Sequence, residues 1–136
     1  MLNPDEIREW IKKAENDFDG ALYLSRRRKK PLPDLVCFHC QQSAEKYLKA
    51  FLILNNSSFP KTHDLIVLLN LYKKYDPDLE LYLDLFEYIN PYSVQFRYPG
   101  DEVDISEAKN AIKQIKKIRK IMRMKFPAYL FDIEAD

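Results

Sequence analysis

The sequence has 136 residues, a formal net charge of +1, 46% hydrophobic residues and only two glycines. This composition excludes a disordered tail and suits one domain with a single core, which we expect over residues 1–136. No apolar run reaches the ~18 residues of a membrane helix, and the start lacks the basic and apolar regions of a signal peptide, so we expect a cytoplasmic protein.

Apolar residues recur at helical spacing from the start of the chain, and no segment combines β-branched residues with the alternation of a strand. Asn3, Pro4 and Glu6 form a helix start, which predicts a first helix over about 4–26. A basic linker with two prolines follows, and a second helix should span about 33–56.

Three more helices are predicted after the second. Thr62 is the expected cap of a third helix that ends before Asp76, and a fourth helix should span about 78–89. After an irregular segment, Asp104 or Ser106 should start a fifth helix that ends near residue 125.

These elements predict an all-α fold, an antiparallel bundle of four or five helices with its core over about 4–125. The C-terminal tail, 126–136, contains several large apolar residues. We expect this tail to dock on the bundle or on a neighbouring molecule.

Charge is unevenly distributed along the chain. Residues 76–107 carry nine acids and one base, residues 109–125 carry eight bases and no acid, and residues 26–30 are five consecutive bases. Two interpretations stay open. The acidic and basic surfaces face each other within the fold or across a dimer, or the basic segments contact nucleic acid, because clustered cations displace counterions from phosphates.

The second predicted helix has an apolar stripe opposite a polar arc. At 100° per residue, the stripe consists of Cys37, Cys40, Ala44, Tyr47, Phe51 and Leu54. On the other side His39, Gln42, Lys46 and Lys49 fall within an arc of roughly 80°, and Glu45 flanks it. Because Ala50 and Ile53 also lie on that side, we expect another helix, a second subunit or a ligand to cover it partly.

The cysteines at 37 and 40 form a Cys-x-x-Cys pair, which is found in metal and redox sites. Both lie on the apolar stripe, where a free cysteine behaves as a small hydrophobic residue. A tetrahedral zinc site needs four ligands, and the chain has no second pair. We therefore expect both cysteines to pack in the core.

Four blocks of sequence stand out together. They are Trp10, Ala14, Asp17 and Ala21; Gln41-Gln42-x-x-Glu45-Lys46-x-x-Lys49-Ala50; Thr62-His63-Asp64-Leu65; and Arg97-Tyr98-Pro99. Their combination resembles the HEPN family, whose members are small α-helical proteins often paired with a minimal nucleotidyltransferase. The resemblance covers about residues 5–125 and implies a HEPN-like bundle.

The resemblance also implies a nucleotide-binding site. Its residues would be His39, Gln42, Glu45, Lys46, Lys49, His63, Arg97 and Tyr98. Charged groups suit phosphate, amides read base edges and tyrosines stack on bases. The alternatives stay open: a solvated face with a Glu45–Lys49 pair, structural roles for both histidines, and an ion pair of Arg97 with a nearby acid.

The sequence departs from the nuclease members of the family, which carry an arginine followed four to six residues later by a histidine. No histidine follows Arg97, and no arginine lies at that spacing before His39 or His63. We therefore expect no catalytic residue, metal or cofactor.

The resulting hypothesis is a homodimeric binding and regulatory module. The resemblance suggests a minimal nucleotidyltransferase as its partner, in a toxin–antitoxin type of system. An RNA endonuclease with a degenerate site and a purely structural interaction protein are the alternatives, and contact with RNA stays open.

Overall fold

The computed structural model describes residues 3–94 and 98–134, and within them the protein is helical without any strand. The α-helices are α1 (Pro4–Ser25), α2 (Pro33–Leu54), α3 (Leu65–Tyr72), α4 (Leu83–Ile89) and α5 (Ile105–Arg123). Three 3-10 helices are η1 (Pro77–Tyr82), η2 (Asn90–Ser93) and η3 (Ala128–Glu134). The predicted all-α helical bundle is confirmed.

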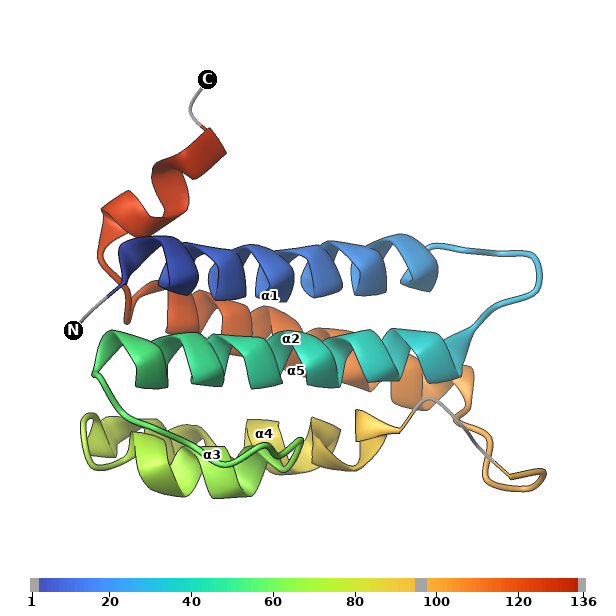
Figure 1. Ribbon diagram of the computed structural model, residues 1–136. Helices are drawn as coiled ribbons and strands as arrows, with labels where there is room; N and C mark the ends of the chain where they lie inside the picture. Colours follow the sequence, from blue (N-terminus) through green and yellow to red (C-terminus); the bar gives the residue numbers. More distant parts are fainter. Residues whose placement is uncertain (1–2, 95–97, 135–136) are drawn as a thin grey trace.

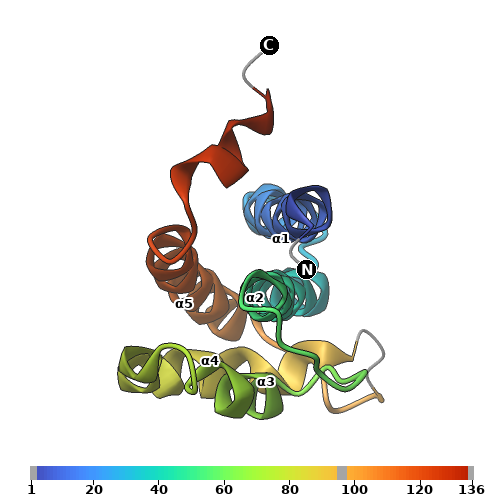
Figure 2. The same ribbon diagram turned by 60° about the vertical axis from the view of Figure 1, so that its left-hand side comes forward.

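The helices form three layers: α1 on one side, α2 with α5 in the middle, and α3 with α4 on the other side (Figure 2). Figure 1 shows that α1 and α2 are antiparallel neighbours. The connection 55–64 returns along α2, so α3 runs in the same direction as α2 (Figure 1). This return brings the residues just before α3 beside the middle of α2.

The helix starts follow from local side-chain chemistry. The Oδ1 atom of Asn3 accepts from the backbone N–H groups of Asp5 and Glu6 at 3.1 and 3.2 Å, as predicted. Asp104 caps α5 through a 2.7 Å bond from the backbone N–H of Glu107. These bonds satisfy N–H groups that the helix itself leaves without acceptors.

Two predicted helix boundaries are wrong. The third helix begins at Leu65, not near Thr62, because Asp64 is its cap and accepts from the backbone N–H of Ile66 at 2.9 Å. The predicted fourth helix divides into η1 and α4. The break lies at Tyr82, whose backbone angles (φ −108°, ψ 14°) are not helical.

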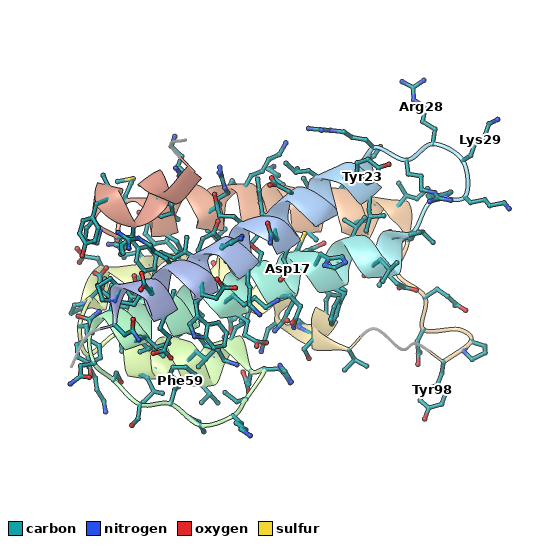
Figure 3. The ribbon with its side chains drawn as sticks, turned by 45° about the horizontal axis from the view of Figure 1, so that its top comes forward. Asp17, Tyr23, Arg28, Lys29, Phe59 and Tyr98 are labelled. Atoms are coloured by element: carbon teal, nitrogen blue, oxygen red, sulfur yellow. The ribbon has the colours of Figure 1, made fainter. Side chains whose placement is uncertain are left out.

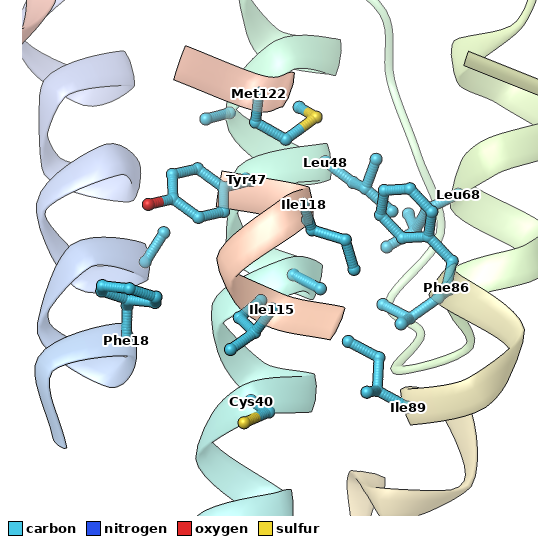
Figure 4. Close-up of a cluster of buried hydrophobic side chains, with 14 of the residues drawn as sticks. Phe18, Cys40, Tyr47, Leu48, Leu68, Phe86, Ile89, Ile115, Ile118 and Met122 are labelled. Atoms are coloured by element: carbon cyan, nitrogen blue, oxygen red, sulfur yellow. The ribbon is translucent and has the colours of Figure 1, made fainter. Parts of the chain in front are cut away.

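The core surrounds α2 and takes side chains from all five α-helices. Figure 4 shows its centre, with Phe18, Cys40, Tyr47, Leu48, Leu68, Phe86, Ile89, Ile115, Ile118 and Met122. α2 buries residues over most of its circumference, and the arc with His39, Gln42 and Lys46 stays partly exposed. Its neighbours therefore cover part of its polar side as well as its apolar stripe.

The tail packs back on the bundle after α5. Phe126 and Leu130 are buried, and η3 contacts α1. Two of the apolar tail residues are thus covered within the chain itself. No described helix is long and apolar enough to cross a membrane.

Candidate functional site

The polar arc of α2 is partly covered by α1 and by the connection 55–64. Two carboxylates, those of Asp17 and Glu45, each bind two of the polar side chains on or beside this arc. The first group is the Asp17 trio, which consists of Asp17, His39 and Lys46. The second is the Glu45 trio, which consists of Glu45, Lys49 and His63. Each trio joins one carboxylate, one ammonium group and one imidazole.

In the Asp17 trio, a carboxylate from α1 bridges two side chains of α2. The Nδ1 atom of His39 lies 2.9 Å from Oδ1 of Asp17, and Nζ of Lys46 lies 2.5 Å from Oδ2. Burial raises the pKa of Asp17, but the hydrogen bonds from His39 and Lys46 outweigh it and hold the pKa below its usual value. Asp17 is therefore ionised at neutral pH.

The Glu45 trio lies deeper. Nζ of Lys49 is 2.9 Å from Oε2 of Glu45, and their side chains are only 9% and 4% exposed. The Lys49 ammonium also lies 5.7 Å from the ring centre of Trp10 and 5.8 Å from that of Phe59. Two aromatic faces and one carboxylate thus compensate the charge of this buried lysine.

His63 completes the second trio from the connection before α3. Its Nδ1 atom lies 3.0 Å from Oε1 of Glu45. Gln41, which is fully buried, donates to the backbone carbonyl of His63 at 2.7 Å. Gln42 in turn donates to the side-chain oxygen of Gln41 at 2.8 Å. The adjacent glutamines therefore help to fix the connection to α2.

The two histidines have the same chemical arrangement. A carboxylate accepts hydrogen bonds but cannot donate them, so Nδ1 of each ring carries the hydrogen. The Nε2 atom on the opposite side makes no hydrogen bond to a described residue. The side chains of His39 and His63 are 28% and 69% exposed, so both rings are reached by solvent at least in part. Gln42 and the two imidazoles therefore lie along the partly exposed side of α2, whereas the Gln41 amide is buried.

Three predicted site residues are outside these trios: Gln42, which is hydrogen-bonded to Gln41 and Glu45, and Arg97 and Tyr98. Arg97 lies outside the described residues. Tyr98 follows it in the connection to α5 and is 68% exposed. Figure 3 shows Tyr98 pointing away from the bundle, toward the end opposite Phe59. Of the seven predicted residues that the structure describes, it thus places six on or beside α2 and leaves Tyr98 apart.

Sequence reasoning missed several partners of the predicted residues. Asp17 stood out only for its spacing, and Gln41 was not assigned to the site. Glu15 was missed as well: it accepts from Tyr47, from Nε and Nη2 of Arg119 at 2.9 Å, and from Arg123 at 2.8 Å. Because these partners are distant in sequence, no local pattern could reveal them.

This Glu15 cluster connects α1, α2 and α5. Burial raises the pKa of Glu15, but the hydrogen bonds from Arg119 and Tyr47 outweigh it and lower the pKa below its usual value. Burial, together with the same carboxylate, raises the pKa of Tyr47. The cluster is a cross-link between helices whose groups are already paired.

The cysteine pair lies in the core, as predicted. Neither Cys37 nor Cys40 forms a disulfide, both are fully buried, and burial strongly raises the pKa of the Cys40 thiol. Among the described residues, no group of three or more histidine, cysteine, aspartate or glutamate side chains is arranged to hold a metal.

The chain was compared with solved structures, curated proteins and protein-family models. A crystal structure of TT1696 from Thermus thermophilus is similar, with a TM-score of 0.71 and 21% sequence identity, over 88% of this chain and 98% of that one. This likeness shows a shared fold. None of the curated proteins compared with the chain matches it. The family model of the HEPN domain matches residues 7–125. The chain therefore belongs to the HEPN domain family, as a helical module related to nucleotides or RNA.

Proposed function

We propose that the protein is a nucleotide-binding regulatory module that partners a minimal nucleotidyltransferase in a toxin–antitoxin type of system. The observation that carries the nucleotide-binding proposal is the repeated trio on α2. Each trio holds an imidazole by its Nδ1 atom, and Nε2 makes no hydrogen bond to a described residue. In the imidazolium form both ring nitrogens donate, so Nε2–H would bind a phosphate oxygen while Nδ1–H keeps its carboxylate.

The exposed and the buried members of the trios would have different roles. Lys46 and His39 are partly exposed, and His63 is mostly exposed, so these three would contact phosphate. Glu45 and Lys49 are buried and would position His63 rather than contact the nucleotide. A charge-assisted hydrogen bond to phosphate contributes about 1.5–3 kcal/mol.

Calorimetry with a panel of nucleoside mono-, di- and triphosphates tests this proposal. His63→Ala and Lys46→Met should each weaken binding by roughly tenfold to a hundredfold, the range that follows from such a bond. Lys74→Met is the matched control, because Lys74 is exposed and lies outside both trios. If the wild-type protein binds no nucleotide at millimolar concentration, the proposal is wrong.

A structural role for the same side chains is the second candidate. The burial of Glu45 and Lys49 favours it, because their charges already compensate each other. In that case His63→Ala would lower the free energy of unfolding without any nucleotide-dependent effect. Thermal unfolding with and without nucleotide separates the two functions, since a ligand that binds the folded state stabilises it.

A separate experiment tests whether the chain forms a homodimer and whether it binds a minimal nucleotidyltransferase. The chain should be co-expressed with a minimal nucleotidyltransferase encoded beside it, and the purified material should be analysed by light scattering. We expect a homodimer of the chain alone and a stable complex of both proteins. A toxin–antitoxin role further predicts that expressing one protein alone slows growth and that co-expression restores it. Separate elution of the two proteins would contradict the partnership.

A further inference from the structure

A hollow lies at the end of the bundle where α1 passes into α2. It has a volume of about 290 Å³. Its walls are the end of α1, the connection 26–32 and the first turns of α2 and α5. The lining residues are Leu24, Ser25, Arg27, Arg28, Pro31, Leu32, Pro33, Val36, Ile105, Ala108 and Lys109. Neither trio contributes a residue to this cavity.

The cavity is lined mainly by aliphatic side chains, and its charged side chains are all positive. None of the three cations forms an ion pair with a described residue. Nε of Arg27 donates to the backbone carbonyl of Lys29 at 3.0 Å, which restrains the guanidinium group. The two terminal nitrogens, Nη1 and Nη2, make no hydrogen bond to a described residue and can donate to a ligand. Lys109 approaches from α5. Arg28 extends away from the bundle (Figure 3).

We propose that this cavity binds a small aliphatic carboxylate. The apolar walls would hold the hydrocarbon part, while Arg27 and Lys109 would bind the carboxylate at the rim. A guanidinium group matches the planar geometry of a carboxylate and forms two parallel hydrogen bonds to it. Ligand sites typically combine such apolar walls with a few well-placed polar groups.

Size and composition restrict the ligand further. A volume of 290 Å³ is near the lower end of small-molecule cavities, which begin at about 300 Å³, so the ligand is small. The lining contains no aromatic ring on which a nucleobase could stack. The cavity is therefore distinct in chemistry from the nucleotide site proposed on α2, and the two proposals fail independently.

Octanoate is the probe for this site, and 1-octanol is the uncharged control. Calorimetry on the full chain should show saturable binding of one octanoate per chain, with octanol at least roughly tenfold weaker, because a charge-assisted bond is lost. The variant Arg27→Gln/Lys109→Gln should weaken octanoate binding by roughly tenfold or more. Lys29→Gln is the matched control, since Lys29 is a neighbouring cation that points away from the bundle (Figure 3).

Ser25→Leu gives an independent test of the location. Ser25 is exposed on the last turn of α1 and lines the cavity, so a leucine there should fill the hollow without disturbing the core. Circular dichroism checks that each variant folds. If the variant Arg27→Gln/Lys109→Gln does not fold, the octanoate affinity of Ser25→Leu decides the proposal. The proposal is overturned by no saturable octanoate binding at millimolar concentration, by equal affinity for octanol, or by unchanged affinity in Ser25→Leu.

Discussion

Replacing Glu45 by glutamine tests the energetics of the buried trio. The change keeps the shape of the side chain but removes the charge that compensates the Lys49 ammonium, 2.9 Å away. Removing one partner of a buried ion pair typically costs about 3–5 kcal/mol. The aromatic faces of Trp10 and Phe59 still stabilise the cation, each by about 1 kcal/mol. We therefore expect Glu45→Gln to lower the free energy of unfolding by about 1–3 kcal/mol.

The double variant Glu45→Gln/Lys49→Met gives the internal comparison. It removes the cation as well, and buried ion pairs are often replaced by apolar groups at little cost. We expect its stability to lie within about 1 kcal/mol of the wild type, so that the second substitution rescues the first. Such a rescue would show that the cost comes from an uncompensated charge rather than from lost packing.

Urea unfolding measures these differences. Far-UV circular dichroism reports the helices, and the fluorescence of Trp10, the only tryptophan, reports the surroundings of Lys49 directly. Glu9→Gln is the matched control, because Glu9 is an exposed glutamate on α1, and its effect should stay within about 0.5 kcal/mol. The reasoning is refuted if Glu45→Gln is as stable as this control, or if the double variant is no more stable than Glu45→Gln.

Three further predictions follow from other parts of the structure. The folded-state pKa of Asp17 lies below its usual value, so its contribution to stability is present above about pH 4 and is lost as the pH falls through the folded-state pKa. Asp17→Asn should accordingly be less stable than the wild type in urea titrations at pH 7, and the difference should shrink as the pH is lowered below about 4. The Cys40 thiol is buried and protonated, so iodoacetamide should label it far more slowly in native protein than in urea, as mass spectrometry can show. Leu130→Ala should cost about 2–4 kcal/mol in thermal or urea unfolding, whereas Tyr129→Ala, at an exposed neighbour, should cost much less; equal effects would mean that the tail is not docked.

The predicted homodimer rested partly on apolar residues that the structure places inside one chain. Ala50 is fully buried, and Leu130 of the tail is buried as well. Neither residue remains as a surface for a partner. The homodimer stays a prediction, to be decided by the mass of the protein in solution.

The sequence by itself determined the family, the helical class and most helix boundaries. Caps such as Asn3 and Asp104 bind backbone groups within one turn, and the spacing of apolar residues repeats over a few turns. Both signals can therefore be recognised in a short stretch of sequence. The wrong start near Thr62 lies where Thr62 and Asp64 both offer a cap, and the hydrogen bond from the backbone N–H of Ile66 to Asp64 decides between them. The break at Tyr82 has no side-chain cap, so no local signal marks it.

Only the tertiary structure showed which side chains the polar residues of α2 contact. The spacing of His39, Lys46 and Lys49 predicted a shared face, but not that α1 would supply Asp17 or that the returning connection would bring His63 to Glu45. These pairings join residues 18 to 29 positions apart. Helical periodicity carries information over a few turns only, whereas the partner of a buried charge is set by which helices pack together. That packing is a property of the whole core.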